Sequence, residues 1–326
     1  MRLLSLAKTP YAGFVAFGAA LMFLPMALTN DYYLNVLIFI GIHSIIAIGL
    51  DLLLGYTGQI SLGHAAFFGL GAYITGVLSA RAGWSPMAGL LVALGGVAVL
   101  AYVIGVPTLK LHGHYLAMAT LGFGIIVYIF FNELVPLTGG PSGLTGIREM
   151  TLFGYDFDTD LEYYYLVCLC LLLTLLLSIN VVRSRVGRAL RAIHGSEVAS
   201  SVLGVDVSRY KVGIFVLSAL YAALAGWLYA HYITFVSPSS FGFMFSVKLV
   251  TMVVIGSLGS LWGAIFGAAL LTSMPEFLHV FENFETTVFG MILMSVMIFM
   301  PRGLLRGIED LLIAGFKSLG GREDGR

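Results

Sequence analysis

Long apolar runs separated by short polar segments dominate the pattern of the chain. Several runs reach the roughly 20 apolar residues that a helix needs to cross a bilayer. The runs are continuous rather than alternating, which distinguishes them from the strands of a membrane barrel. Backbone groups inside lipid must be hydrogen-bonded within their own segment, so these runs are expected to be helices. The sequence predicts spans near residues 11–29, 34–54, 65–80, 86–106, 115–135, 161–182, 212–233, 246–281 and 286–300.

Two of these runs are interrupted by glycine and serine. The run 34–54 continues into GYTGQISLGH (residues 55–64), and the run 246–281 contains GSLGS (residues 256–260). The second run is too long for one ordinary crossing of about 20 residues, so we interpret it as a hairpin that turns at GSLGS. Paired interrupted segments indicate a binding or translocation site in transporters.

The small and polar residues of the two breaks are the candidate translocation residues. Polar side chains inside a membrane are usually functional, whereas glycines also serve close helix packing. Packing fits the glycines better than it fits the polar members of the first break. The candidate pathway residues are Gly55, Thr57, Gln59, Ser61, Gly63, His64, Gly256, Gly259 and Ser260.

Composition supports the membrane interpretation. The chain is 59% hydrophobic and 10% charged, with a mean hydropathy of +0.97, whereas soluble domains carry about 25% charged residues. The apolar N-terminal run is longer than the roughly 7–15 residues of a signal-peptide core, so we expect an uncleaved first span. The predicted fold class is an all-α polytopic membrane protein, a single domain over residues 1–326. Its helix bundle is expected to have about 8–10 transmembrane segments with two Gly-interrupted hairpins.

The placement of charge predicts the orientation. Net charge is zero, with 17 basic and 17 acidic residues, so bulk charge gives no information about partners. No nucleic-acid partner is expected. Basic residues concentrate in residues 183–211, called here the basic segment, which predicts that this segment is cytoplasmic. Counting spans then places the N-terminus and the C-terminal tail (about residues 301–326) in the cytoplasm and the loop 136–160 outside. The count for the tail requires that 246–281 is a hairpin.

The basic segment has the pattern of two short surface helices. An apolar stripe at helical spacing is formed by Val186, Leu190 and Ile193. Gly195 is expected to end this helix and Ser196 to cap a second one. Topology and contact with anionic lipid would account for the basic residues alone, but paired and capped helices favour a docking surface for a cytoplasmic partner. Three arginines project mainly off the stripe: Arg185, Arg188 and Arg191.

Four segments in order carry a resemblance to a known family. They are GYTGQISLGHAAFFGLGAYITG (55–76), LTGGPSGLTGI (137–147), RSRVGRALRAI with the following E and LGVD (183–206), and VVIGSLGSLWGAIFGAAL (253–270). Together they resemble the permeases of bacterial branched-chain amino-acid ABC importers, most of all the M-type subunit of the heterodimeric pair. MPRGL (300–304) before the basic tail fits the same family.

The resemblance implies a permease subunit that translocates branched-chain or related amino acids across the inner membrane. It implies four kinds of partner in addition to lipid: a second, H-type permease, two cytoplasmic ATPase subunits and a periplasmic amino-acid-binding protein. It also implies that the first break lies near the translocation path and that the basic segment contacts the ATPase. The family's EAA–Gly signature is present here as EVA with its glycine one position late. The candidate coupling residues are Arg185, Arg188, Arg191, Glu197, Gly204 and Asp206.

The sequence contains few signs of chemistry on this chain. No G-x-x-x-x-G-K-[ST] motif is present, so the chain lacks the loop that cradles ATP phosphates. We therefore expect no enzyme activity and no cofactor bound by this chain, with ATP hydrolysed on partner subunits. His112 and His114 lack further metal ligands nearby, and Ser61 with His64 lacks a local carboxylate to orient the histidine. The alternative function is a self-sufficient channel or a secondary carrier for a small neutral solute.

Overall fold

The computed structural model describes residues 12–27, 31–111, 113–152 and 154–278, together with the single residues 290 and 294. The tail 301–326 and, apart from residues 290 and 294, the predicted span 286–300 lie outside the described residues. The long helices are α2 (Ala12–Ala27), α3 (Asp31–Thr57), α4 (His64–Ala82), α5 (Pro86–Thr108), α6 (His114–Glu133), α8 (Asp160–Arg183), α11 (Val207–Ile233), α12 (Phe243–Gly256) and α13 (Leu261–Leu278).

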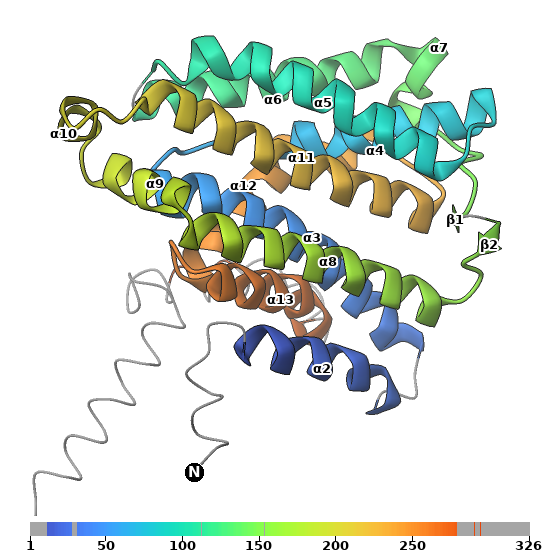
Figure 1. The fold of residues 1–326 in the computed structure, drawn as a ribbon. Helices are drawn as coiled ribbons and strands as arrows, with labels where there is room; N and C mark the ends of the chain where they lie inside the picture. The colour runs from blue at the N-terminus through green and yellow to red at the C-terminus, as the bar shows by residue number, and fades with distance from the viewer. Residues whose placement is uncertain are drawn as a thin grey trace, which may run out of the picture.

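Short elements mark the two ends of the bundle. At one end lie α9 (Arg185–Gly195) and α10 (Glu197–Val202), and at the opposite end lie α7 (Val135–Thr138) and the strands β1 (Thr151–Leu152) and β2 (Tyr155–Asp156) (Figure 1). The strands pair antiparallel, with Thr151 opposite Asp156. The remaining turns are η1 (Gly140–Ser142) and η2 (Pro238–Phe241). We call the two ends the α9–α10 end and the opposite end.

The helices confirm an all-α polytopic membrane protein. Among the described residues, six helices are long and apolar enough to cross a membrane, namely those beginning at Tyr32, His64, Pro86, His114, Asp160 and Val207. Two shorter apolar helices, Gly13–Met26 and Phe243–Gly256, accompany them.

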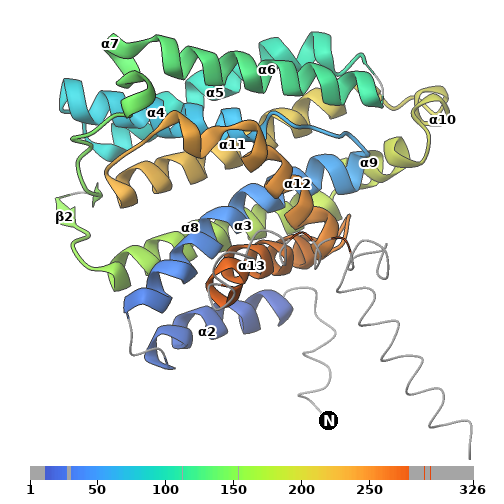
Figure 2. The same cartoon turned by 180° about the vertical axis from the view of Figure 1, so that it is seen from behind.

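Helix α3 forms the centre of the bundle. Every residue from Gly41 to Leu54 is buried, because α8, α11, α12 and α13 all pack against this helix. Helices α5 and α6 lie along one side of the bundle and α2 along the other (Figures 1 and 2). Outward-facing side chains such as Leu91, Val99 and Ile126 are exposed, as expected for helices that face lipid or another subunit.

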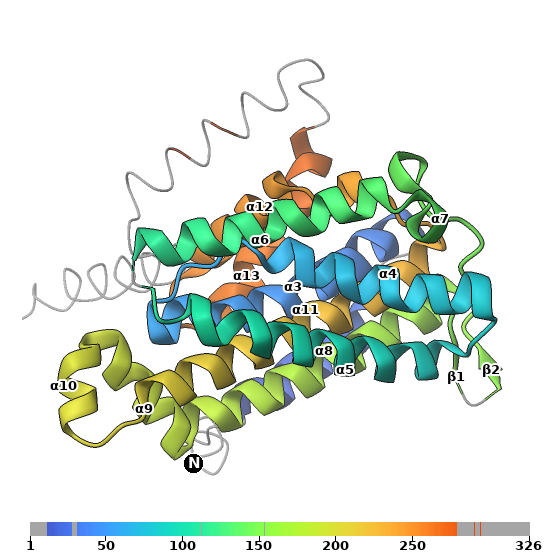
Figure 3. The same ribbon diagram turned by 90° about the horizontal axis from the view of Figure 1, so that it is seen from above.

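Glycines allow the closest helix contacts. A Cβ on Gly71 would overlap the Ala223 backbone, and one on Gly226 would overlap the carbonyl of Phe68, so α4 and α11 run in parallel at backbone distance (Figure 3). In the same way, Gly256 meets Gly263 and Gly267 meets Met252. These last two pairs run in reverse order along the chain, which confirms the hairpin predicted for residues 246–281.

Candidate functional site

The first break is an irregular segment between two long helices. Helix α3 ends at Thr57 and α4 begins at His64. The chain turns at Gly58, whose φ of +70° favours glycine. The Gly58 and Gln59 amides donate to the carbonyls of Leu54 (3.1 Å) and Leu53 (3.2 Å), and the Thr57 hydroxyl also donates to Leu53. The end of α3 is therefore capped by its own residues before the chain leaves it.

This segment re-enters the bundle instead of staying at its surface. His64 contacts Ser218 of α11, which lies 11 positions after Val207 and therefore roughly 16 Å along the helix from its start. Gln59, Ser61 and His64 are all buried. Irregular backbone at such depth is tolerated where it is buried in protein or lines a cavity, and here buried positions alternate with the exposed Gly58 and Ile60.

Three other helices hold the first break through hydroxyl groups. The Leu62 amide donates to Thr120 Oγ1 of α6 (3.0 Å), and the Ala65 amide donates to Ser246 Oγ of α12 (3.2 Å). His64 is fixed at both ring nitrogens: Nε2 lies 2.6 Å from Ser218 Oγ and Nδ1 lies 3.0 Å from Ser61 Oγ. A neutral imidazole offers one donor and one acceptor, and hydroxyls satisfy both.

Sequence reasoning missed these three hydroxyl residues of α6, α11 and α12. Each is a Ser or Thr within a largely apolar helix, and such residues also occur bonded only to their own helix backbone. Their partnership with the first break depends on tertiary packing.

Gln59 stands apart within the first break. Its side chain is only 3% exposed, and within the described structure neither its Oε1 nor its Nε2 has a hydrogen-bond partner. An unsatisfied buried polar group costs about 1–3 kcal/mol, and such a group in a native protein calls for an explanation in function or in another state.

The second break, residues 257–260, meets the first. A Cβ on Gly55 would overlap the backbone of Gly259, although the two glycines are 204 positions apart in sequence. The Gly259 amide donates to Asp51 Oδ1 at 2.8 Å, and Asp51 is fully buried. Ser260 accepts from the Gly263 amide (3.2 Å) and so caps α13. The structure thus brings the two sets of pathway candidates together and adds Asp51, which the sequence analysis did not select.

The basic segment forms the two predicted helices. Ser184 accepts from the Val186 amide (3.0 Å) to cap α9, and Ser196 accepts from the Ala199 amide (3.2 Å) to cap α10. The predicted apolar stripe is correct for Leu190 and Ile193, which are buried, but wrong for Val186, which is 38% exposed. Gly187 takes its place, because a Cβ there would overlap the carbonyl of Val182.

Among the candidate coupling residues, all but Glu197 are exposed. Arg185, Arg188 and Arg191 are exposed. Glu197 instead forms an ion pair with Lys211 of the same chain. Asp206 caps α11 by accepting from the Arg209 amide (3.1 Å), and Gly204, with a φ of +84°, follows the end of α10.

Three apolar side chains that the sequence analysis did not select project from the tip of the α9–α10 end. Val198, Val202 and Leu203 are 75%, 82% and 82% exposed. Large apolar side chains grouped on a polar segment mark a contact surface. The same segment also reaches the first break, because a Cβ on Gly58 would lie 3.3 Å from His194 Nδ1.

The described residues do not support a metal site. Within the described ranges, no group of three or more His, Cys, Asp or Glu side chains could hold a metal ion. His112 lies outside those ranges, and His114 is exposed at the start of α6.

Comparison with known proteins gives a consistent set of relatives. Residues 32–301 match the family described as "Branched-chain amino acid transport system / permease component". The chain is 35% identical over 292 residues to the high-affinity branched-chain amino acid transport system permease protein LivM of Salmonella typhimurium, covering 81% of this chain and 68% of the relative. It is 28% identical over 288 residues to the corresponding LivH protein of Escherichia coli, covering 81% and 91%. The fructose import permease protein FrcC of Rhizobium meliloti is 29% identical over 226 residues, covering 66% and 62%. No solved structure matches the chain.

Proposed function

The chain belongs to the family of branched-chain amino acid transport system permease components, and from this premise we propose that it is one transmembrane subunit of an ATP-driven importer in the bacterial inner membrane. Its resemblance to the M-type subunit, seen first in four motifs, is confirmed by the 35% identity to LivM. The proposed cargo is a branched-chain or related amino acid.

Partner subunits complete this proposal. LivM and LivH are both named as permease proteins of one kind of transport system, which supports a second, H-type permease beside this chain. Two cytoplasmic ATPase subunits and a periplasmic binding protein are the further proposed partners. Because no phosphate-binding loop occurs in the sequence, the energy source is assigned to the ATPase subunits.

The α9–α10 end is the proposed docking surface for an ATPase, and it faces the cytosol in this proposal. The observation that supports it is the combination of exposed Val198, Val202 and Leu203 with the exposed arginines of α9. Central apolar anchors surrounded by arginine are typical of protein interfaces. The N- and C-termini lie on the same side in this topology.

The first break is the proposed moving part of the translocation path. Its polar residues lie inside the bundle, Gln59 finds no hydrogen-bond partner in the part of the chain that the structure describes, and α9 lies close to it at Gly58. Closure of the ATPases would push on α9 and α10 and open the path to each side in turn.

Reconstitution tests the proposed function. We expect labelled leucine to enter liposomes only when this chain is combined with its sister permease, both ATPases, the binding protein and ATP. Leucine flux through the purified chain alone, without ATP, would contradict the proposal and favour a channel or secondary carrier.

A charge reversal tests the docking surface. Arg188→Glu with Arg191→Glu is expected to abolish co-purification of the ATPase while the chain still inserts in the membrane. Lys110→Glu, at an exposed site between α5 and α6, is the control and is expected to retain the ATPase. Co-purification that survives the double reversal would remove the docking assignment.

A further inference from the structure

The Glu197–Lys211 ion pair joins the first residue of α10 to the first turns of α11. Lys211 is only 2% exposed, whereas the Glu197 side chain is 32% exposed. A buried charge requires a partner, and removal of that partner is strongly destabilising. The family resemblance implies that Glu197 contacts an ATPase, but in this structure its carboxylate is bound to its own chain.

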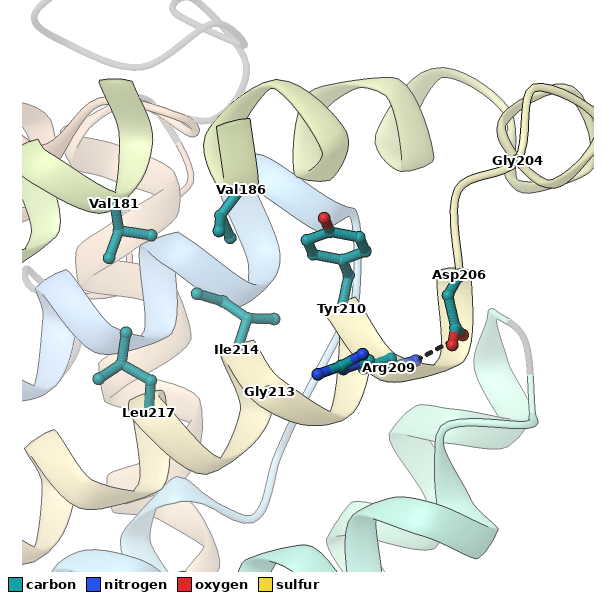
Figure 4. A pocket seen from close by; sticks show the side chains of 9 residues that line it. All are labelled: Val181, Val186, Gly204, Asp206, Arg209, Tyr210, Gly213, Ile214 and Leu217. Carbon is teal, nitrogen blue, oxygen red and sulfur yellow. Dashed lines mark hydrogen bonds between the residues drawn. The ribbon is translucent and has the colours of Figure 1, made fainter. Parts of the chain in front are cut away.

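A hollow lies beside the first turns of α11, the helix that carries Lys211. The cavity has a volume of about 600 Å³ and lies between the end of α8, the start of α9 and the first turns of α11 (Figure 4). Val181, Ile214 and Leu217 form its inner wall, and Arg209 and Asp206 lie toward Gly204 (Figure 4). Protein interiors are normally close-packed, whereas here Val186 at the start of α9 and Ile214 of α11 both line the hollow.

Helix α11 connects Lys211 to the first break through Ser218. Ser218 lies seven positions, about two turns, after Lys211, so the two residues lie on one face of the helix roughly 10 Å apart. Both are buried. Ser218 hydrogen-bonds His64 at 2.6 Å, and His64 contacts Ser61 at 3.0 Å. A displacement of Lys211 is therefore transmitted along a continuous helix to the first break.

We propose that Glu197 and Lys211 are positioning residues for transport, whose ion pair ties α10 to α11 so that movement of the docked basic segment displaces Ser218, His64 and the first break. This inference rests on the proposed function and names the contact that would transmit movement from the docked basic segment to the first break. Glu197 acts on Lys211 within the chain and not on the ATPase surface.

The experiment uses the complete reconstituted complex and measures leucine uptake and ATP hydrolysis in the same proteoliposomes. Lys211→Met is expected to retain assembly and ATP hydrolysis within about twofold while uptake falls at least about tenfold, a loss that corresponds to about 1.4 kcal/mol of coupling. Glu197→Gln should lower uptake in the same way, but it leaves the buried Lys211 charge without its carboxylate and should therefore also lower the thermal midpoint of the complex in detergent. The charge swap Glu197→Lys with Lys211→Glu is expected to restore uptake to within about threefold of the parent. Lys110→Met makes the same chemical change at an exposed site and is the matched control.

A reversible bridge gives a second measurement that does not depend on a stable Lys211→Met protein. Glu197→Cys with Lys211→Cys is made with Cys168 and Cys170 replaced by alanine. Linking the two thiols with a short bis-methanethiosulfonate reagent is expected to raise uptake, and reduction with dithiothreitol is expected to lower it again in the same sample.

The outcomes separate this inference from the proposed function. Normal uptake by Lys211→Met, or a bridge without effect on uptake, would overturn the link while leaving ATP-driven uptake by the parent intact. Loss of ATPase co-purification in Glu197→Gln alone, without rescue by the charge swap, would instead place Glu197 on the ATPase surface and also overturn the inference. Failure of the parent complex to transport would count against the proposed function itself.

Discussion

The two breaks touch each other, yet they are built from different chemistry. The first break, residues 55–64, and the adjoining Ala65 amide are held by hydroxyl groups of α6, α11 and α12, and the Gln59 amide has no hydrogen-bond partner among the described residues. The second break, residues 257–260, is flanked by glycines that pack backbone against backbone, and its Gly259 amide is fixed by Asp51. Hydroxyl side chains from three helices hold the first break, whereas the second combines close glycine contacts with one carboxylate and the Ser260 cap.

This difference separates a moving element from a fixed support. Backbone-to-backbone glycine contacts leave little room for displacement, because interiors at that density have no alternative packing nearby. Hydrogen bonds between a re-entrant segment and three separate helices can exchange partners when those helices shift. We therefore assign transport to the first break and structural support to the second.

The largest expected effect is at the second break. Gly256→Leu places a side chain against the carbonyl of Gly263, so its cost should exceed the about 1–3 kcal/mol of ordinary overpacking. We expect the variant to be lost from the membrane, as measured by immunoblot of membrane fractions. Gly95→Leu is the matched control, because no atom of the described residues lies within 4 Å of a Cβ there. Normal levels of Gly256→Leu would contradict the assignment of support.

A smaller effect, on function only, is expected at the first break. Ser61→Leu removes the hydroxyl that contacts His64 Nδ1 and fills the space beside it. Uptake in the reconstituted complex should fall at least about tenfold, a change of about 1.4 kcal/mol, while the subunits still co-purify. Ser142→Leu, at an exposed site in η1, serves as the control. If Ser61→Leu transports normally, the first break is a packing element like the second.

The smallest expected effect is at Gln59, where a substitution should raise the stability of the fold and lower transport. Gln59→Met removes two unpaired polar atoms from a buried site while roughly keeping the shape, which should stabilise the fold by about 1–3 kcal/mol. The thermal midpoint in detergent is expected to rise, and uptake is expected to fall several-fold. A lower midpoint together with normal uptake would show that the amide is used for folding alone.

The sequence predicted the architecture well because apolar runs and interrupted runs are local signals. The helices, the hairpin turn at GSLGS and the two capped helices of the basic segment could all be predicted from residues close together in the chain. The prediction that Val186 belongs to the buried stripe was wrong. Position 187 faces α8 instead, so closely that it excludes any side chain, and the hydrophobic pattern does not indicate how close two helices pack.

The contacts between distant segments could not be predicted in this way. The Gly55–Gly259 contact, the Ser218–His64 bond and the Glu197–Lys211 pair each join residues whose neighbours in sequence give no sign of the partner. A charged residue such as Lys211 in a basic segment suggests solvent exposure, whereas the fold buries it. Pathway and coupling roles therefore stay predictions that the variants above can test.

State-dependent accessibility of two buried serines tests the central claim most directly. Ser61→Cys and Ser257→Cys, each made without Cys168 and Cys170, place one thiol in each break, and both positions are buried in this conformation. Labelling by a small charged methanethiosulfonate reagent is measured in the assembled complex, with and without ATP and vanadate. We predict that the thiol at position 61 changes its labelling rate at least about tenfold between the two conditions while the thiol at position 257 stays unreactive in both. Equal rates at position 61 in both conditions, or a change at position 257 alone, would contradict the account.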